Sequence, residues 1–343
     1  THQDAELGPE DFSAAMTIHW GDGTESPGEI TQPGGPGTEY LVTGSHMYAQ
    51  PGSYPVWVHV RDLITGLDST PVSNVTALQG SQAEATITID PTNPNRVFAA
   101  AVEATKRDLP SRGLPVSVSN DGGVTWASRV IADGSDSLPH ASADPRAVFD
   151  QFGNLFLTYL SVTDTPGRKV VVVLSTDGGR NFRPLFASPH ESEDFPSITV
   201  GPGPEPGQGS VWLTWEHSGS GIRAAGATVN GLDQVNGLDQ VGTFHEVLVA
   251  AQTGELGSFE LNFGDIAIGP DGQVLLSYFD QRPSISMLNI HLDPDGLGPQ
   301  PFGPAVPVTG SNVRNGTMIP AQDTTRGIVD KANLAWERSD GPN

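Results

Sequence analysis

Acidic, basic and imidazole side chains recur along this chain in two sets of loops that the sequence places at one end of its strands. The first set comprises Glu103, Arg107 and Asp108, then Asp164, then Glu216 and His217, then Asp280, Gln281 and Arg282; the second comprises His140, Asp144 and Arg146, then His190, Glu191 and Asp194, then Glu260 and Asp265. Arginine pairs with carboxylates through its planar fork, and carboxyl and imidazole groups transfer protons. A face lined by such groups predicts a binding site for a polar ligand.

Three of these acids have a second interpretation. Asp144, Asp194 and Asp265 recur where strands begin. At such positions an Asp side chain commonly caps a turn by accepting a backbone N–H. The sequence favours this turn-capping role for all three. Tyr159 and Tyr278 lie within apolar strands and are predicted to be core residues.

Motifs for metals and cofactors are incomplete or missing. The Asp293-Pro294-Asp295-Gly296 turn is rich in oxygen ligands, but the closing Glu of a calcium loop is absent, so a turn is favoured over a calcium site. The histidines form no HExxH pair, and the chain has neither a Gly-rich phosphate loop nor a Gly-x-Ser-x-Gly elbow. We therefore expect no cofactor, with calcium the one metal left open.

The strands that must position these residues are marked by a repeated turn. Two complete copies, Ser119–Trp126 and Ser175–Phe182, read Ser-x-Asp-Gly-Gly-x-x-aromatic, and two looser copies end at Phe244 and Phe302. The markers Asp121, Asp177, Asp239 and Asp295 are 56, 62 and 56 residues apart, and the longer step contains a tandem Val-Asn-Gly-Leu-Asp-Gln at 229–234 and 235–240. A fixed period of this size predicts a radially repeated β fold.

An apolar segment precedes each of these turns and has the same period. The four segments are Val97–Ala101, Leu155–Tyr159, Val211–Trp215 and Val274–Tyr278. We expect each to be the second of four strands in one blade of a β-propeller. A fifth unit begins near Asn312 and includes Ala332–Trp336 before the chain stops. We therefore expect a propeller of six blades, of which this chain holds about four and a half as a fragment of a longer protein.

The first 78 residues have a different pattern. Met16–Trp20 alternates before a Gly-Asp-Gly turn, and alternation returns from Tyr54 to Val60, which predicts a small two-sheet sandwich. Trp20-Gly21-Asp22-Gly23, His46-Met47-Tyr48 and Gly52–Val58 resemble the polycystic-kidney-disease (PKD) module, an immunoglobulin-like domain of bacterial extracellular proteins. The resemblance implies a PKD-like domain over 1–78, truncated at its N-terminus, followed by the propeller over 79–343.

The repeated turn resembles the Asp-box, or bacterial neuraminidase repeat (BNR). From about residue 83 the chain is similar to the sialidase β-propeller superfamily. In that family the Asp-boxes lie at the rim opposite the substrate, which implies structural roles for Asp121, Trp126, Asp177 and Phe182.

The same resemblance implies catalytic residues of the sialidase type: three arginines that bind the sugar carboxylate, an Asp acid, and a Tyr nucleophile activated by a Glu. Arg107, Arg146 and Arg282 are the candidates for the arginines and Asp108 for the acid, with His140, Asp194, Glu216 and Asp280 as candidate ligand-binding residues. The family's Phe- or Tyr-Arg-Ile-Pro motif is absent, and the tyrosine is expected in a later blade.

Composition narrows the class of partner. The formal net charge of −23 argues against nucleic acid and against anionic membrane surfaces. Cysteine is absent, and no apolar run approaches the ~20 residues of a membrane span. The sequence therefore predicts a secreted or cell-surface bacterial protein that recognises glycans, with exo-hydrolysis of terminal sialic acid as its enzymatic version. The alternative is a non-catalytic adhesion or carbohydrate-binding module.

Overall fold

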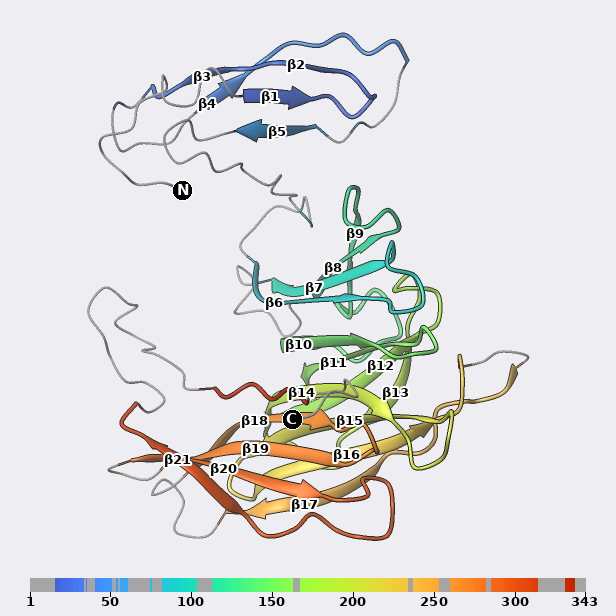
Figure 1. Ribbon diagram of the computed structural model, residues 1–343, viewed down its shortest axis with the longest axis vertical. Coiled ribbons are helices and arrows are strands. Elements are labelled where there is room, and N and C mark those ends of the chain that lie inside the picture. Colours follow the sequence, from blue (N-terminus) through green and yellow to red (C-terminus); the bar gives the residue numbers. More distant parts are fainter. Residues whose placement is uncertain are drawn as a thin grey trace. The chain divides into compact units, whose positions relative to one another are not determined.

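The computed structural model describes residues 16–33, 35, 41–50, 54, 56–60, 75, 82–103, 113–162, 167–233, 237–252, 260–281, 285–313 and 331–336. The chain divides into two compact units, Thr1–Asn74 and Val75–Asn343, shown in Figure 1. The boundary expected at residue 78 falls among residues 76–81, outside the described part of the chain, and stays a prediction. The described residues form strands and turns, so the fold is all-β. None of their segments is a helix long and apolar enough to span a membrane.

The described residues of the first unit form two small antiparallel sheets. One has the order β2-β1-β5, with β1 at Met16–His19, β2 at Glu25–Pro27 and β5 at Trp57–Val60; the other pairs β3 (Glu29–Thr31) with β4 (Leu41–Thr43). The alternation of the first strand buries Met16 and Ile18 on one side. The turn that follows is closed by Asp22, which accepts hydrogen bonds from Thr24 and lies 2.8 Å from His46 Nε2. These contacts lower the pKa of Asp22 to about 2. The resemblance to a PKD module remains a prediction.

In the second unit the described residues form four antiparallel four-stranded sheets, each a meander in chain order. Sheet I comprises β6 (Gln82–Ile89), β7 (Val97–Glu103), β8 (Leu114–Ser119) and β9 (Ala127–Ile131). Sheet II comprises β10 (Ala141–Phe149), β11 (Leu155–Val162), β12 (Arg168–Ser175) and β13 (Arg183–Ala187). Sheet III comprises β14 (Glu193–Pro202), β15 (Gly209–His217), β16 (Gly221–Val229) and β17 (His245–Ala251), and sheet IV comprises β18 (Glu260–Ile268), β19 (Val274–Gln281), β20 (Ser286–Asp293) and β21 (Val306–Ser311). Each predicted apolar segment lies in the second strand of its sheet, as expected.

The sheets pack face to face in chain order (Figure 1). One apolar core lies between sheets I and II, a second between II and III, and a third between III and IV. The first strands β6, β10, β14 and β18 are neighbours in space, so they form the inner side of the array. Consecutive four-stranded meanders with adjacent first strands are typical of propeller blades. The described residues show four such sheets and no closed ring.

The two complete Asp turns close by the same hydrogen bonds. In the first, the Ser119 hydroxyl donates to Asp121 and accepts from Gly123 N, and Asp121 accepts from Thr125 N at 2.9 Å. In the second, Asp177 accepts from Asn181 N at 2.9 Å, and Ser175 accepts from Gly179 N. Burial alone would raise the pKa of Asp121 and of Asp177, but these hydrogen bonds outweigh it and lower both values. The turns therefore use both carboxylates structurally.

The aromatic residues of these turns differ in burial. Phe182 packs into the core between sheets I and II, with its ring centroid 5.8 Å from that of Phe98. Gly179 (φ 92°) makes room for this, since a Cβ there would lie 2.6 Å from the Phe98 ring. Trp126 is only partly buried, and its Nε1 donates to the Gly123 carbonyl.

The third turn is closed by a different aspartate from the one that the spacing indicates. Asp239 is largely exposed, whereas Asp233 of the first tandem copy is 2 % exposed. Asp233 accepts from Gln240 N and Val241 N and pairs with Arg183 of sheet II. The second copy thus lies in a lengthened loop, and the spacing misplaced the marker by one six-residue repeat.

A described segment beyond sheet IV continues the inner array. Leu334 N, in segment 331–336, donates to Asp265 Oδ2 of β18 at 2.6 Å. A similar contact joins β10 to β6, where Ala147 N lies 3.3 Å from Thr86 Oγ1. Segment 331–336 therefore lies beside β18, as β10 lies beside β6.

Candidate functional site

Each of the four inner strands carries an irregularity at the same place. The pairing register shifts between Ala83 and Thr86 in β6, Ala143 and Arg146 in β10, Asp194 and Ser197 in β14, and Asn262 and Asp265 in β18. The first residue of the bulge is Glu84, Asp144 or Phe195 in the first three strands, with φ of 58°, 53° and 50°. Left-handed backbone is uncommon for residues other than glycine and is concentrated at functional sites. The repeated bulge therefore marks one level of the inner face as a candidate site.

The bulges bring three carboxyl groups together. Asp144 N donates to Glu84 Oε2 at 2.9 Å, and the carboxyl groups of Asp144 and Asp194 share a hydrogen bond. Burial, followed by the negative charges of Glu84 and Asp194, raises the pKa of Asp144 to about 7, although Arg146 opposes the shift. Asp144 is therefore an acid that can hold its proton near neutral pH. We call Glu84, Asp144 and Asp194 the carboxylate cluster.

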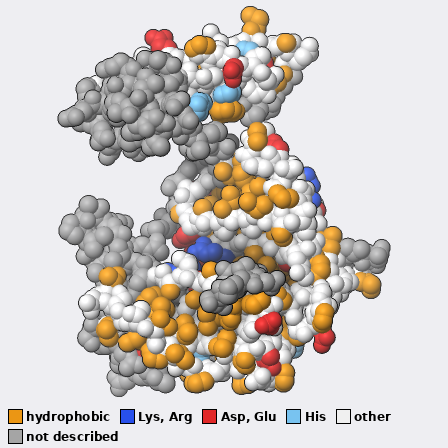
Figure 2. Space-filling model, viewed as in Figure 1, with side chains coloured by type: hydrophobic (Ala, Val, Ile, Leu, Met, Phe, Trp, Pro, Cys, Tyr) orange, Lys and Arg blue, Asp and Glu red, His pale blue; other side chains and the backbone are white. Residues whose placement is uncertain are grey.

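Three basic groups adjoin the carboxylate cluster. Arg168 Nη1 lies 3.6 Å from Asp194 Oδ1, and Arg146 donates to the Pro145 carbonyl at 2.8 Å. Burial, followed by Arg146, lowers the pKa of Lys331, while Asp265 and Asp144 oppose the shift. Figure 2 shows Lys and Arg side chains at a hollow of the second unit. The site thus balances acids with bases.

The cluster lies at the opposite end of the strands from the Asp turns. In a meander, the turns from first to second strand and from third to fourth lie at one end, and the other connections lie at the other end. Asp144 is near the start of β10, whereas the Asp121 and Asp177 turns join third to fourth strands. This arrangement fits the structural role expected for the Asp turns.

The residues expected from the sequence fall into three groups. Arg146 and Asp194 lie in or beside the carboxylate cluster. Glu216 lies opposite Asp194 in the β14–β15 ladder, so it is also next to the cluster. His140 is exposed in the loop before β10, and Asp280 lies in β19 opposite Leu261; neither belongs to the cluster. Arg107, Asp108 and Arg282 are outside the described residues, as is Asp164, and their roles stay predictions.

Sequence reasoning missed Glu84 and Lys331 and assigned Asp144 to turn capping. A signal was present, because Glu84 and Asp144 are 60 residues apart, close to the repeat period. Asp194 does accept from the next backbone N–H, that of Phe195, at 3.1 Å, and Asp265 accepts from Ser197 Oγ at 2.6 Å. Turn or strand stabilisation therefore describes part of what Asp194 and Asp265 do. It does not describe Asp144.

Tyr159 and Tyr278 are buried strand residues, as the sequence indicates. The Tyr159 hydroxyl donates to the Pro139 carbonyl at 2.7 Å, and burial raises its pKa. A tyrosine held in this way is unsuited to act as a nucleophile. Among the described residues, no cluster of three or more His, Asp or Glu side chains is arranged to hold a metal ion.

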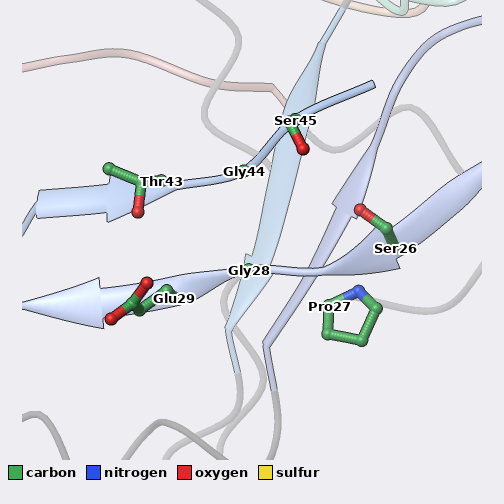
Figure 3. A pocket seen from close by; sticks show the side chains of 7 residues that line it. All are labelled: Ser26, Pro27, Gly28, Glu29, Thr43, Gly44 and Ser45. Carbon is green, nitrogen blue, oxygen red and sulfur yellow. The ribbon is translucent and has the colours of Figure 1, made fainter. Parts of the chain in front are cut away.

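A depression of about 500 Å³ lies in the first unit (Figure 3) and is lined by Ser26, Pro27, Gly28, Glu29, Thr43, Gly44 and Ser45. Ile18 packs closely against Gly44, where an added Cβ would lie only 2.4 Å from Ile18 Cδ1. Glu29 is the one ionisable side chain among the lining residues. The depression lacks the convergent acids and bases of the carboxylate cluster, which is the stronger candidate site.

No family model matches the chain, and no curated protein matches it. Among solved structures it is similar to an α-L-arabinanase of Penicillium chrysogenum, at 15 % identity over 75 % of this chain and 79 % of that one (TM-score 0.47). A Hadza microbial sialidase matches at 14 % identity over 75 % of this chain and 53 % of its own (TM-score 0.45). An endo-arabinase of Bacteroides thetaiotaomicron matches at 12 % identity over 68 % and 83 % (TM-score 0.41). No functional residue is carried over from these proteins.

Proposed function

We propose that the second unit binds a glycan at the carboxylate cluster and hydrolyses a glycosidic bond there. The observation that carries this proposal is Asp144, a buried acid whose pKa is raised to about 7 beside two other carboxyl groups. Glycoside hydrolysis uses one carboxyl group that donates a proton to the leaving oxygen and a second that activates water or attacks the sugar.

We assign the proton-donating role to Asp144. Asp194 hydrogen-bonds to the Asp144 carboxyl, so it is too close to act across a scissile bond, where the two groups stand ~5 Å apart or more. Its role is to help keep the proton on Asp144. Glu84 contacts the Asp144 backbone rather than its carboxyl and is our candidate for the second carboxylate. Phe195, at the equivalent bulge of β14, would offer an apolar ring for the face of a sugar.

Two of the three arginines on the strands around the site already pair with acids, which favours a neutral sugar over sialic acid. Arg168 pairs with Asp194, Arg223 pairs with Glu246 and Arg146 donates to Pro145. An arginine already bonded to an acid must exchange that partner to bind a sugar carboxylate. Terminal sialic acid stays the alternative substrate, and Arg107 and Arg282 would have to supply the binding.

The test is release of a fluorogenic aglycone from a panel that includes arabinosides, glucosides, galactosides and a sialoside. We expect turnover of at least one neutral glycoside, lowered about 10²–10⁴-fold by Asp144→Asn, the usual contribution of a general acid. Asp239→Asn, an exposed acid at the other end of the strands, is the matched control and should retain full activity. Turnover of none of the panel, together with no binding of the corresponding oligosaccharides, would contradict the proposal.

A further inference from the structure

A strained corner leads into β14 just before the carboxylate cluster. Ser192 and Phe195 have φ of 78° and 50°, and they enclose Glu193 and Asp194. Such backbone persists only where surrounding contacts hold it. One of these contacts is the hydrogen bond from Ser218 N to the Ser192 carbonyl at 3.0 Å. The corner thus needs further contacts to keep Asp194 in place.

Glu193 supplies a second contact from inside the protein. It is 1 % exposed, and its Oε2 lies 3.0 Å from His217 Nδ1. The ladder places Glu193 opposite His217, and Asp194 opposite Glu216. Because consecutive strand residues point to opposite sides, Glu193 is anchored in the interior while Asp194 lies at the site.

Charged groups of β16, β17 and the loop before β14 lie near this pair. Arg223 of β16 bonds to Glu246 of β17, and His190 of the preceding loop lies with its ring centroid 5.2 Å from that of His217. Burial raises the pKa of Glu193 to about 8, with Arg223 opposing and Glu246 adding to the shift. Burial, Arg223 and His190 lower the pKa of His217. Both shifts disfavour the charged forms, so Glu193 and His217 are joined by a buried hydrogen bond rather than by an ion pair.

We propose that Glu193 and His217 are positioning residues, whose buried hydrogen bond fixes the corner from Ser192 to Phe195 and thereby holds Asp194 against Asp144. The role in catalysis rests on the proposed function, whereas the positioning itself does not. It can be measured without any glycoside, through the effect of Asp194 on the titration of Asp144. The other charged groups that face Asp144 are Glu84, Arg146 and Lys331.

The experiment measures the free energy of unfolding from pH 4 to pH 9 for the parent and for Asp144→Asn. The difference between them falls from about pH 4, where Asp144 ionises in the unfolded chain, and levels off above the pKa of Asp144 in the folded protein. We expect this upper limit, the midpoint of the folded-state titration, near pH 7. The measurement is repeated in a His217→Phe background, which retains an aromatic ring but no Nδ1. We expect the midpoint to fall by about one pH unit or more, because Asp194 is released from Asp144.

Two further backgrounds separate positioning from packing. Glu193→Gln keeps a group that can bond to His217 and should leave the midpoint near 7, whereas Glu193→Asp shortens the side chain and should lower it. His190→Phe keeps the ring contact with His217 and should leave the midpoint unchanged. If His217→Phe does not fold, Glu193→Asp decides the question. Equal destabilisation at every pH with an unmoved midpoint would overturn the proposal, as would the absence of any Asp144-dependent midpoint in the parent. Failure to hydrolyse a glycoside would affect only the proposed function.

Discussion

Asp144→Asn should make the protein more tolerant of alkaline pH. The pKa of this carboxyl is raised from 3.8 to about 7 by burial and by Glu84 and Asp194, so ionising it in the folded protein is unfavourable. The sign follows from linkage. The contribution of protonated Asp144 to the free energy of unfolding is fully present below pH 4 and is lost as pH rises through about 7. A shift of roughly 3 units corresponds to about 4 kcal/mol, of which about 2–3 kcal/mol is lost between pH 5 and pH 8.

The assay is urea unfolding of the parent and of Asp144→Asn at pH 5 and pH 8, with Asp239→Asn as the exposed control. Asn is among the residues that best tolerate the left-handed backbone at this position. We expect the parent to lose more stability than Asp144→Asn between the two pH values, by about 2–3 kcal/mol. The control should follow the parent. Identical pH dependence in all three proteins would refute the burial and charge argument on which the candidate site depends.

Three other predictions test the fold. Gly179→Ala should destabilise the second unit by about 2–4 kcal/mol, because the added Cβ would meet the Phe98 ring. Gly123 has a similar φ, but its added Cβ would have its nearest neighbour at 3.6 Å, so Gly123→Ala should cost about 1–2 kcal/mol. Thermal or urea melts measure both losses, and equal losses would contradict this account. Asp233→Asn should cost about 1–2 kcal/mol, because it weakens the bonds that the Asp233 carboxylate accepts from Gln240 N, Val241 N and the partly exposed Arg183. Asp239→Asn should cost no more than about 0.5 kcal/mol, and the reverse order would restore Asp239 as the turn residue. Tyr159→Phe should cost about 1–2 kcal/mol, since it removes the donor to the Pro139 carbonyl, and an unchanged urea midpoint would argue against that bond.

The sequence could predict the strands and the complete Asp turns because their signals are local. Ser119 to Trp126 and Ser175 to Phe182 each contain the residues that close their own turn. The tandem copies show where local signals end. Asp233 and Asp239 occupy the same position of the two sequence copies, and they differ in burial and in the bonds that Asp233 accepts from Gln240 N and Val241 N.

The carboxylate cluster depends on contacts that no single segment encodes. Glu84 of sheet I contacts Asp144 of the neighbouring sheet II. Each of these residues lies at a bulge of its own strand, and a bulge leaves no clear pattern in side-chain alternation. Lys331 approaches the cluster from segment 331–336, which lies beside β18 through the Leu334 contact. Arg146 and Asp194 could be selected beforehand because they lie in the first strands of their sheets, near the end where the repeat predicts the site. The sequence could not indicate which of these acids holds a proton, because this depends on the burial of Asp144 in the folded protein.

The most direct test of the central claim is the pH dependence of kcat/KM for whichever glycoside is turned over. Proton donation by Asp144 predicts that kcat/KM falls above pH ~7 with the ionisation of one group, and that this limb is lost together with most of the activity in Asp144→Asn. Full turnover by Asp144→Asn, or a profile with no ionisation near neutral pH, would show that the carboxylate cluster is not the site of hydrolysis.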